Sequence, residues 1–134
     1  MYFEFSEEQK IIRDKAKKFA ETRIAPAQEE DERKGVLRRE IVSEMGKLGF
    51  FSGVIPEEYG GTNAGFLSSI VITEEIAKVS ASYAGHINSQ TAGTGLAILK
   101  HGTRTQKEKY LPRLTSGDMI GSFGTTEPDA GSDV

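Results

Sequence analysis

Cysteine and tryptophan are absent from this 134-residue sequence, and only two histidines are present. Without cysteine the chain can form no disulfide bond and no thiolate zinc site, and two histidines alone cannot complete a closed metal site. An excess of positive charge is also absent, because the 17 lysines and arginines are outnumbered by 20 acidic residues, which gives a net charge of -3. No basic region is available to neutralise nucleic-acid phosphates. We therefore expect neither a metal centre, nor thiol chemistry, nor nucleic-acid binding.

A long apolar run is missing as well. The longest stretch without Asp, Glu, Lys or Arg, residues 79–99, contains too many hydroxyl and amide side chains to enter hydrocarbon. The N-terminus, MYFEFSEEQK, has acidic residues where a signal or transit peptide would have basic ones. We therefore expect no membrane span and a cytoplasmic location, and we interpret residues 79–99 as a central helical segment.

What is present instead is helical periodicity. Ser6 and Gln9 have the spacing of a capping box, and an apolar stripe follows them, which predicts a first helix that ends at Pro26. The acidic run 29–32 is interpreted as a solvated linker, because basic residues follow it directly. Similar patterns predict four more helices, over residues 37–48, 66–80, 82–101 and 103–114.

Two single residues refine these boundaries. Gly49 is placed where a helix commonly ends with a left-handed residue. Pro112 lies inside the last predicted helix, where it removes a backbone donor, so we expect a kink or a break there.

The character of the sequence changes after Asp118. Residues 119–126 are rich in strand formers and residues 127–133 form a loop, which predicts the first strand of a sheet. A strand without a partner is not stable on its own. We therefore divide the chain into a helical domain, residues 1–117, and the start of a truncated β-domain, residues 118–134, and expect it to be a fragment. From composition alone, the loop could be a phosphate-binding turn or an ordinary turn between strands.

The segment FGTTEPDAGSD, residues 123–133, resembles the flavin-contacting signature of the acyl-CoA dehydrogenases. Other stretches that are similar to the family's motifs appear upstream in the family's order, at residues 56–61, 74–77 and 106–112. The resemblance spans almost the whole chain. It implies an all-α N-terminal helical bundle of the acyl-CoA dehydrogenase type, followed by the first strand and loop of a truncated β-domain.

The resemblance also implies a cofactor, a substrate and a reaction. In the family, residues at the positions of Phe123, Thr125 and Thr126 lie along the isoalloxazine ring of FAD, and the residue at Ser132 serves the FAD pyrophosphate and the acyl-CoA thioester. Such enzymes introduce an α,β double bond by removing the α-proton and transferring the β-hydride to flavin. The base is a glutamate expected beyond Val134, so no residue of this chain is assigned as catalytic.

Further expectations concern partners and the acyl group. The family resemblance implies electron-transferring flavoprotein as partner and a homotetramer as the full-length protein. The loop is most similar to the glutaryl-CoA branch, but Ala84 stands where that branch has an arginine for the distal carboxylate, so a neutral acyl group is expected. A helix face with His86, Ser89, Gln90 and Gly93 either lines the acyl pocket or makes ordinary helix contacts.

Two other functions remain open at this point. A relative of the same fold could be an acyl-CoA oxidase or a flavin monooxygenase. Alternatively, the chain could be a free-standing helical binding module without a cofactor.

Overall fold

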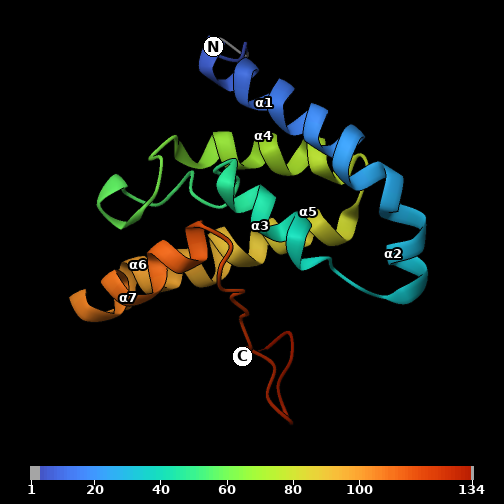
Figure 1. The fold of residues 1–134 in the computed structure, drawn as a ribbon. Helices are drawn as coiled ribbons and strands as arrows, with labels where there is room; N and C mark the ends of the chain where they lie inside the picture. Colours follow the sequence, from blue (N-terminus) through green and yellow to red (C-terminus); the bar gives the residue numbers. More distant parts are fainter. Residues whose placement is uncertain (1–3, 134) are drawn as a thin grey trace.

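The chain begins its helical structure with α1 (Glu7–Phe19). The predicted capping box is present, because the Gln9 backbone N–H donates to Ser6 Oγ at 3.2 Å and the Ser6 N–H donates to Gln9 Oε1 at 2.9 Å. Together these bonds satisfy two backbone donors that a helix start would leave unpaired. The computed structural model describes residues 4–133, and Figure 1 shows them as a bundle of helices from which the C-terminal segment extends.

Pro26 does not end the first helical region. After α1 the chain makes a π-helical turn (Ala20–Ile24) and a 3-10 turn (Ala25–Ala27), and then continues as α2 (Gln28–Lys34). Proline is tolerated in the first turn of a helical segment, where its missing N–H would have no partner. The acidic run that was predicted to be a linker is therefore helical. Glu29, Glu30 and Asp31 lie in the first turn of α2, and the basic residues Arg33 and Lys34 lie in its last turn, which suits the helix dipole.

Helix α3 (Arg39–Lys47) confirms the second predicted helix. Gly49 follows it in the predicted left-handed conformation, with φ of 80°. The next segment carries two buried aromatic rings, Phe50 and Phe51, and a single 3-10 turn (Glu57–Tyr59). The ring of Phe50 meets that of Phe19 edge to face at 5.6 Å, which fixes this segment against α1.

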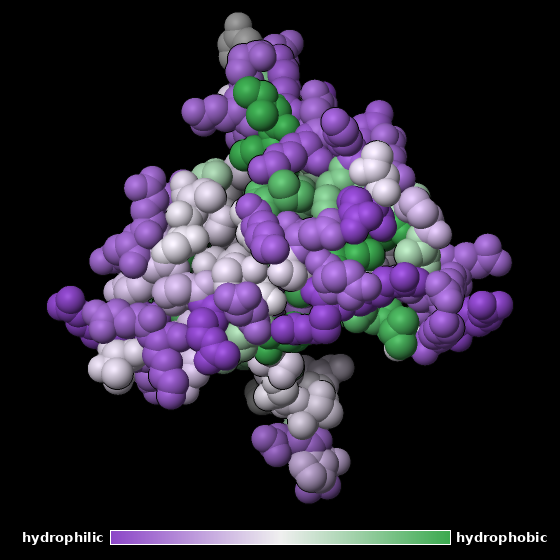
Figure 2. Space-filling view, viewed as in Figure 1, coloured by the Kyte–Doolittle hydropathy of each residue, from purple (hydrophilic) through white to green (hydrophobic). Residues whose placement is uncertain are grey.

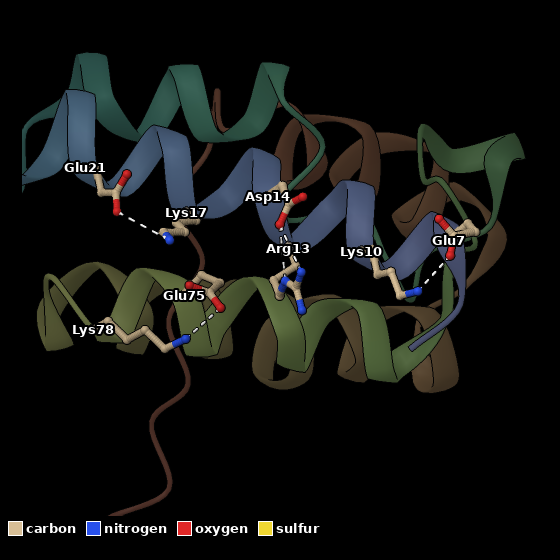
Figure 3. Close-up of polar contacts among 8 residues, drawn as sticks. All are labelled: Glu7, Lys10, Arg13, Asp14, Lys17, Glu21, Glu75 and Lys78. Carbon is tan, nitrogen blue, oxygen red and sulfur yellow. Dashed lines mark hydrogen bonds and ion pairs between the residues drawn. The ribbon is translucent and has the colours of Figure 1, made fainter. Parts of the chain in front are cut away.

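Helix α4 (Gly65–Ala77) runs beside α1, as Figures 1 and 3 show. One side of α4 is buried against the core through Val71, Ile72 and Ile76. Figure 3 shows the ion pair at its C-terminal end, where Lys78 Nζ lies 2.7 Å from Glu75 Oε1. The Glu75 carboxylate is almost fully buried, so this pair keeps a charge satisfied next to the core.

The long charge-free segment forms one continuous helical stretch with an irregular middle. Helix α5 (Ala81–Asn88) leads into a π-helical segment (Ser89–Gly95), which leads into α6 (Leu96–His101). The prediction of a helix over 82–101 is thus confirmed, but its centre is wider than an α-helix. Segments of π-helix inside α-helices often occur at functional sites.

Helix α7 (Arg104–Thr115) begins with the second predicted capping box, formed by Thr103 and Gln106. It continues through Pro112 to Thr115, so the predicted break is absent. The buried side chains of Leu111 and Leu114 hold the last turn against the rest of the protein on both sides of the proline. Their packing offsets the loss of one backbone hydrogen bond at the proline.

Two apolar clusters form the core of the described residues. The larger cluster lies between α1, α3, α4 and α5 and includes Phe19, Met45, Ile76 and Ile87. The smaller cluster joins Ile55 to Leu111 and Leu114 of α7. Figure 2 shows hydrophilic residues over much of the outer surface, interrupted by apolar patches. Within residues 4–133, no helix is both long enough and apolar enough to cross a membrane.

No strand is present among residues 4–133. The strand predicted over residues 119–126 is an extended segment that leaves the helices, and only an isolated bridge joins Glu127 to Ala130. The reason is that the described residues offer this segment no neighbouring strand to pair with.

Candidate functional site

The candidate site is the segment that follows α7. It begins with a tight turn in which Gly117 adopts a φ of 76°, and a Cβ at this position would come within 2.8 Å of the Val42 carbonyl oxygen. Ser116 Oγ donates to Asp118 Oδ2 at 2.8 Å, and the Met119 N–H donates to the Arg113 carbonyl at 2.9 Å. This turn directs the chain from α7 towards the π-helical segment.

Gln90, in the π-helical segment, binds the chain on both sides of this turn. Its Nε2 donates to the Leu114 carbonyl at 2.9 Å and to the Met119 carbonyl at 2.6 Å. Its Oε1 accepts from the Gly121 N–H at 2.7 Å. Gln90 is 1 % exposed; its bond to Leu114 is buried, and its bonds to Met119 and Gly121 are partly buried. A single amide therefore joins the end of α7 to the start of the extended segment.

A second contact lies one turn further along the same helix. Thr94 Oγ1 donates to the Ser122 carbonyl at 3.1 Å. A Cβ on Gly121 would lie only 2.7 Å from the side chain of Thr94, so the close approach requires glycine at this position. A Cβ on Gly93 would lie 3.8 Å from Phe123 Cβ, which places Phe123 beside the π-helical segment.

The four residues predicted to bind cofactor or substrate all lie on the exposed part of this segment. Phe123 is 62 % exposed, and Thr125, Thr126 and Ser132 are exposed as well. The Glu127 N–H donates to the Ala130 carbonyl at 2.8 Å, and the reverse bond is 3.3 Å. This turn places Thr126 and Ser132 on the two arms of one loop. Their contacts with a ligand are not tested by the structure and stay predictions.

The helix face that was expected to line an acyl pocket is partly buried and partly exposed. His86 and Gln90 are buried, whereas Ser89 is exposed and Gly93 is half-buried. His86 packs edge to face on Phe51 at 5.3 Å, and its Nε2 has no hydrogen-bond partner among residues 4–133. Burial lowers the pKa of His86, and the positive charge of Arg39 lowers it further. The ring is therefore neutral at pH 7.

Two further residues of the site were not identified from the sequence as anchors. The sequence predicts Gln90 only as a residue that lines a pocket or makes helix contacts, and it predicts no role in the site for Thr94. A signal existed for Gln90, because a glutamine in a charge-free helix expected to be buried needs hydrogen-bond partners. The sequence does not indicate that these partners belong to the segment after α7, about 30 residues later.

The acidic run also gives a buried charged cluster that the linker interpretation did not foresee. The Asp31 side chain is only 4 % exposed and lies 2.7 Å from Arg38 Nε. The Tyr83 hydroxyl donates to Asp31 Oδ2 at 3.3 Å and accepts from the Arg38 backbone N–H at 3.0 Å. Burial raises the pKa of Tyr83, so the hydroxyl remains protonated and can donate. This cluster joins α2, α3 and α5 and has a structural role.

The curated relatives of this chain include several acyl-CoA dehydrogenases. Glutaryl-CoA dehydrogenase of Desulfococcus multivorans is 41 % identical, with an alignment that covers 100 % of this chain and 35 % of the relative. The mitochondrial isovaleryl-CoA dehydrogenase of Bos taurus is 39 % identical over 96 % of this chain and 31 % of the relative. The chain thus spans about a third of the length of the curated relatives it matches.

The fold has matches among solved structures as well. One is a glutaryl-CoA dehydrogenase from Mycobacterium smegmatis in complex with FADH2, with a TM-score of 0.89 and 29 % identity. That match covers 96 % of this chain and 33 % of the solved chain. The model of the family "Acyl-CoA dehydrogenase, N-terminal domain" matches residues 6–118, which are nearly all of the helical part. This chain therefore belongs to the acyl-CoA dehydrogenase family, in which it matches the N-terminal helical domain.

Proposed function

We propose that this chain is the N-terminal part of an FAD-dependent acyl-CoA dehydrogenase. In this proposal residues 1–117 are the helical domain and residues 118–134 begin the middle β-domain. The family model that ends at residue 118 supports this boundary. The observation that carries the proposal is the exposed segment with the family's flavin signature, held against the helices by Gln90 and Thr94.

The donor groups of this segment suit FAD. The hydroxyls of Thr125, Thr126 and Ser132 are exposed, and within residues 4–133 none of them forms a hydrogen bond with the protein. Free hydroxyls and backbone N–H groups are suitable donors for pyrophosphate oxygens and flavin ring atoms. Thr125 and Thr126 would hold the flavin ring together with Phe123, and Ser132 would hold the pyrophosphate and the substrate thioester.

The proposed reaction forms an α,β double bond in an acyl-CoA thioester. A carboxylate removes the α-proton, and bound FAD supplies the acceptor for the β-hydride. The residues of this chain orient the cofactor and the thioester, and the base is expected in a C-terminal domain. As partners we propose electron-transferring flavoprotein and three further copies of the protein. A cytoplasmic location stays a prediction.

We propose a neutral acyl group as the substrate class. Ala84 is buried and apolar, and it provides no positive charge that could pair with a distal carboxylate. The relatives named above include enzymes for a dicarboxylic and for a branched neutral acyl group, so their names do not decide between the two.

The test uses the full-length protein, purified with its cofactor. We expect a flavin absorbance spectrum, and we expect isovaleryl-CoA or butyryl-CoA to bleach it under anaerobic conditions. Glutaryl-CoA, as the charged comparison, should bleach it more slowly. A faster reaction with glutaryl-CoA would contradict the assignment of a neutral acyl group while leaving the reaction class intact.

The other candidate functions give different results in the same experiment. Rapid formation of hydrogen peroxide in air would identify an oxidase, and hydroxylation of a substrate would identify a monooxygenase. A colourless protein that takes up no FAD would overturn the proposal in favour of a helical binding module.

A further inference from the structure

Gln90 makes an unusual set of bonds for a helical side chain. All three of its amide bonds go to backbone groups that lie 24 to 31 residues further along the chain. None of them stabilises the helix that carries the residue. The amide itself is buried, so its loss would leave the buried Leu114 carbonyl unsatisfied and would remove the protein partners of two partly buried groups, the Met119 carbonyl and the Gly121 N–H.

The bonds of Gln90 and Thr94 fix consecutive residues of the extended segment. Gln90 binds the N–H of Gly121, and Thr94 binds the carbonyl of Ser122. The two side chains are four residues apart in the π-helical segment, so both bonds start from one rigid element. Two bonds to adjacent residues fix the direction of the chain as well as its position.

The fixed residues directly precede the proposed cofactor contacts. Phe123 follows Ser122 directly, and Thr125 and Thr126 follow after Gly124. An extended chain rises about 3.3 Å per residue, so Thr126 lies within roughly 17 Å of Gly121 along the chain. An error in the direction of the chain at Gly121 is therefore carried directly to the residues that would contact the flavin.

We propose that Gln90 is a positioning residue for flavin binding, which acts by fixing the start of the segment that holds Phe123, Thr125 and Thr126. It does not touch the cofactor itself. The inference rests on the proposed function, because it takes FAD as the ligand of this segment. The π-helical segment is the element that presents both Gln90 and Thr94 to it.

The test variant is Gln90→Met, which keeps the length of the side chain and removes its polar atoms. Thr91→Val is the matched control, because Thr91 is buried in the same π-helical segment but donates within the helix, to the Ile87 carbonyl at 2.7 Å. Thr94→Val is a milder second variant that removes only the bond to Ser122. If Gln90→Met does not fold, Thr94→Val carries the test.

Two measurements are made on the full-length protein. The first is amide hydrogen exchange in a peptide that covers residues 118–124, with and without FAD. The second is the dissociation constant for FAD, with the flavin absorbance spectrum of the bound form. For Gln90→Met we expect exchange at Gly121 to be faster by about tenfold or more, since its acceptor is gone. We expect the dissociation constant to rise by about tenfold, and Thr94→Val to raise it by a few fold.

The results that would overturn the proposed role of Gln90 are as follows. If Thr91→Val weakens FAD binding as much as Gln90→Met does, the effect is general destabilisation and the proposal fails. It also fails if exchange at Gly121 is unchanged, or if exchange rises while FAD affinity and spectrum stay as in the wild type. If the wild-type protein binds no FAD, the proposed function fails instead, and the exchange measurement alone still shows whether Gln90 holds the segment.

Discussion

The Tyr83 hydroxyl is the central group of the buried cluster between α2, α3 and α5. It is both donor and acceptor, since it donates to Asp31 and accepts from the backbone of Arg38. Tyr83 is 1 % exposed; its bond to Asp31 is buried, and the bond that it accepts from the Arg38 N–H is partly buried. Removal of the hydroxyl takes a partner from the Arg38 N–H and from Asp31 Oδ2, while Asp31 keeps its ion pair with Arg38 Nε.

We predict that Tyr83→Phe lowers the free energy of unfolding by about 1–3 kcal/mol. Urea denaturation of the wild type and the variant measures this directly. Tyr110→Phe is the control, because Tyr110 is half-buried and its hydroxyl has no hydrogen bond among residues 4–133. The control should change stability by less than about 0.5 kcal/mol. Equal effects of the two substitutions on the free energy of unfolding would show that the hydrogen bonds of the Tyr83 hydroxyl do not stabilise the protein.

His86 gives the protein a pH dependence of stability with a defined sign. Burial and the charge of Arg39 hold the pKa of His86 below its usual range, whereas the unfolded chain takes up a proton near pH 6.5. As the pH falls from 7 to 5, the unfolded state therefore binds more protons than the folded state. The free energy of unfolding must fall over this interval through this residue.

We predict that His86→Phe makes the slope of stability against pH between 5 and 7 shallower. Phenylalanine keeps an aromatic ring against Phe51 and cannot take up a proton. Thermal unfolding at a series of pH values measures the slope. His101→Gln, at an exposed position at the end of α6, is the comparison. An unchanged slope in His86→Phe would mean that other groups cause the pH dependence.

At the scale of elements, Gly46 determines how closely α3 approaches the turn after α7. A Cβ on Gly46 would overlap the Ser116 carbonyl. Glycine to alanine inside a helix normally stabilises by about 0.5–1 kcal/mol, but forced overpacking costs about 1–3 kcal/mol. We therefore predict that Gly46→Ala destabilises the protein. Gly85→Ala in α5, where no atom lies within 4 Å of the added Cβ, should stabilise it. Denaturation curves that shift in the same direction for both would refute this account of the contact.

Local signals in the sequence predicted those elements that depend on local interactions. Ser6 with Gln9, and Thr103 with Gln106, correctly mark the starts of α1 and α7, because a capping box involves only neighbouring residues. The interpretation of residues 29–32 as a linker was wrong, since Asp31 is held by Arg38 and Tyr83 from other elements. Of the kink or break expected at Pro112, the break is absent, because packing of the leucines around it is a tertiary interaction.

The same distinction explains the candidate site. The motif at residues 123–133 is predicted from its residue types, and its contacts with a cofactor stay a prediction. The π-helical segment and the three bonds of Gln90 could not be predicted, because they depend on how the turn at Gly117 directs the chain back across the helix. The sequence therefore shows which residue types the segment contains, whereas its position against the helices depends on tertiary contacts.

At the scale of the whole molecule, the residues proposed to contact the flavin lie on a segment that extends away from the helices (Figure 1). The same segment lies at the lower edge of the space-filling view in Figure 2, where its pale and purple colours mark residues of intermediate hydropathy and hydrophilic residues. Such a segment contributes few apolar contacts to the core. Its residues can therefore be changed with little effect on the helical domain, which separates ligand binding from stability.

This separation predicts the result of changing the proposed ligand contacts. In the full-length protein, Thr126→Val and Ser132→Ala should each weaken FAD retention by about tenfold, the expected effect of losing one hydrogen bond to a charged or strongly polar group. Because both residues are exposed, the unfolding temperature of the protein without FAD should stay within about 1–2 °C of the wild type. Flavin absorbance after gel filtration measures retention, and calorimetry measures stability. Full FAD content in both variants would show that the cofactor lies elsewhere, whereas a large loss of stability without FAD would show that the segment belongs to the core.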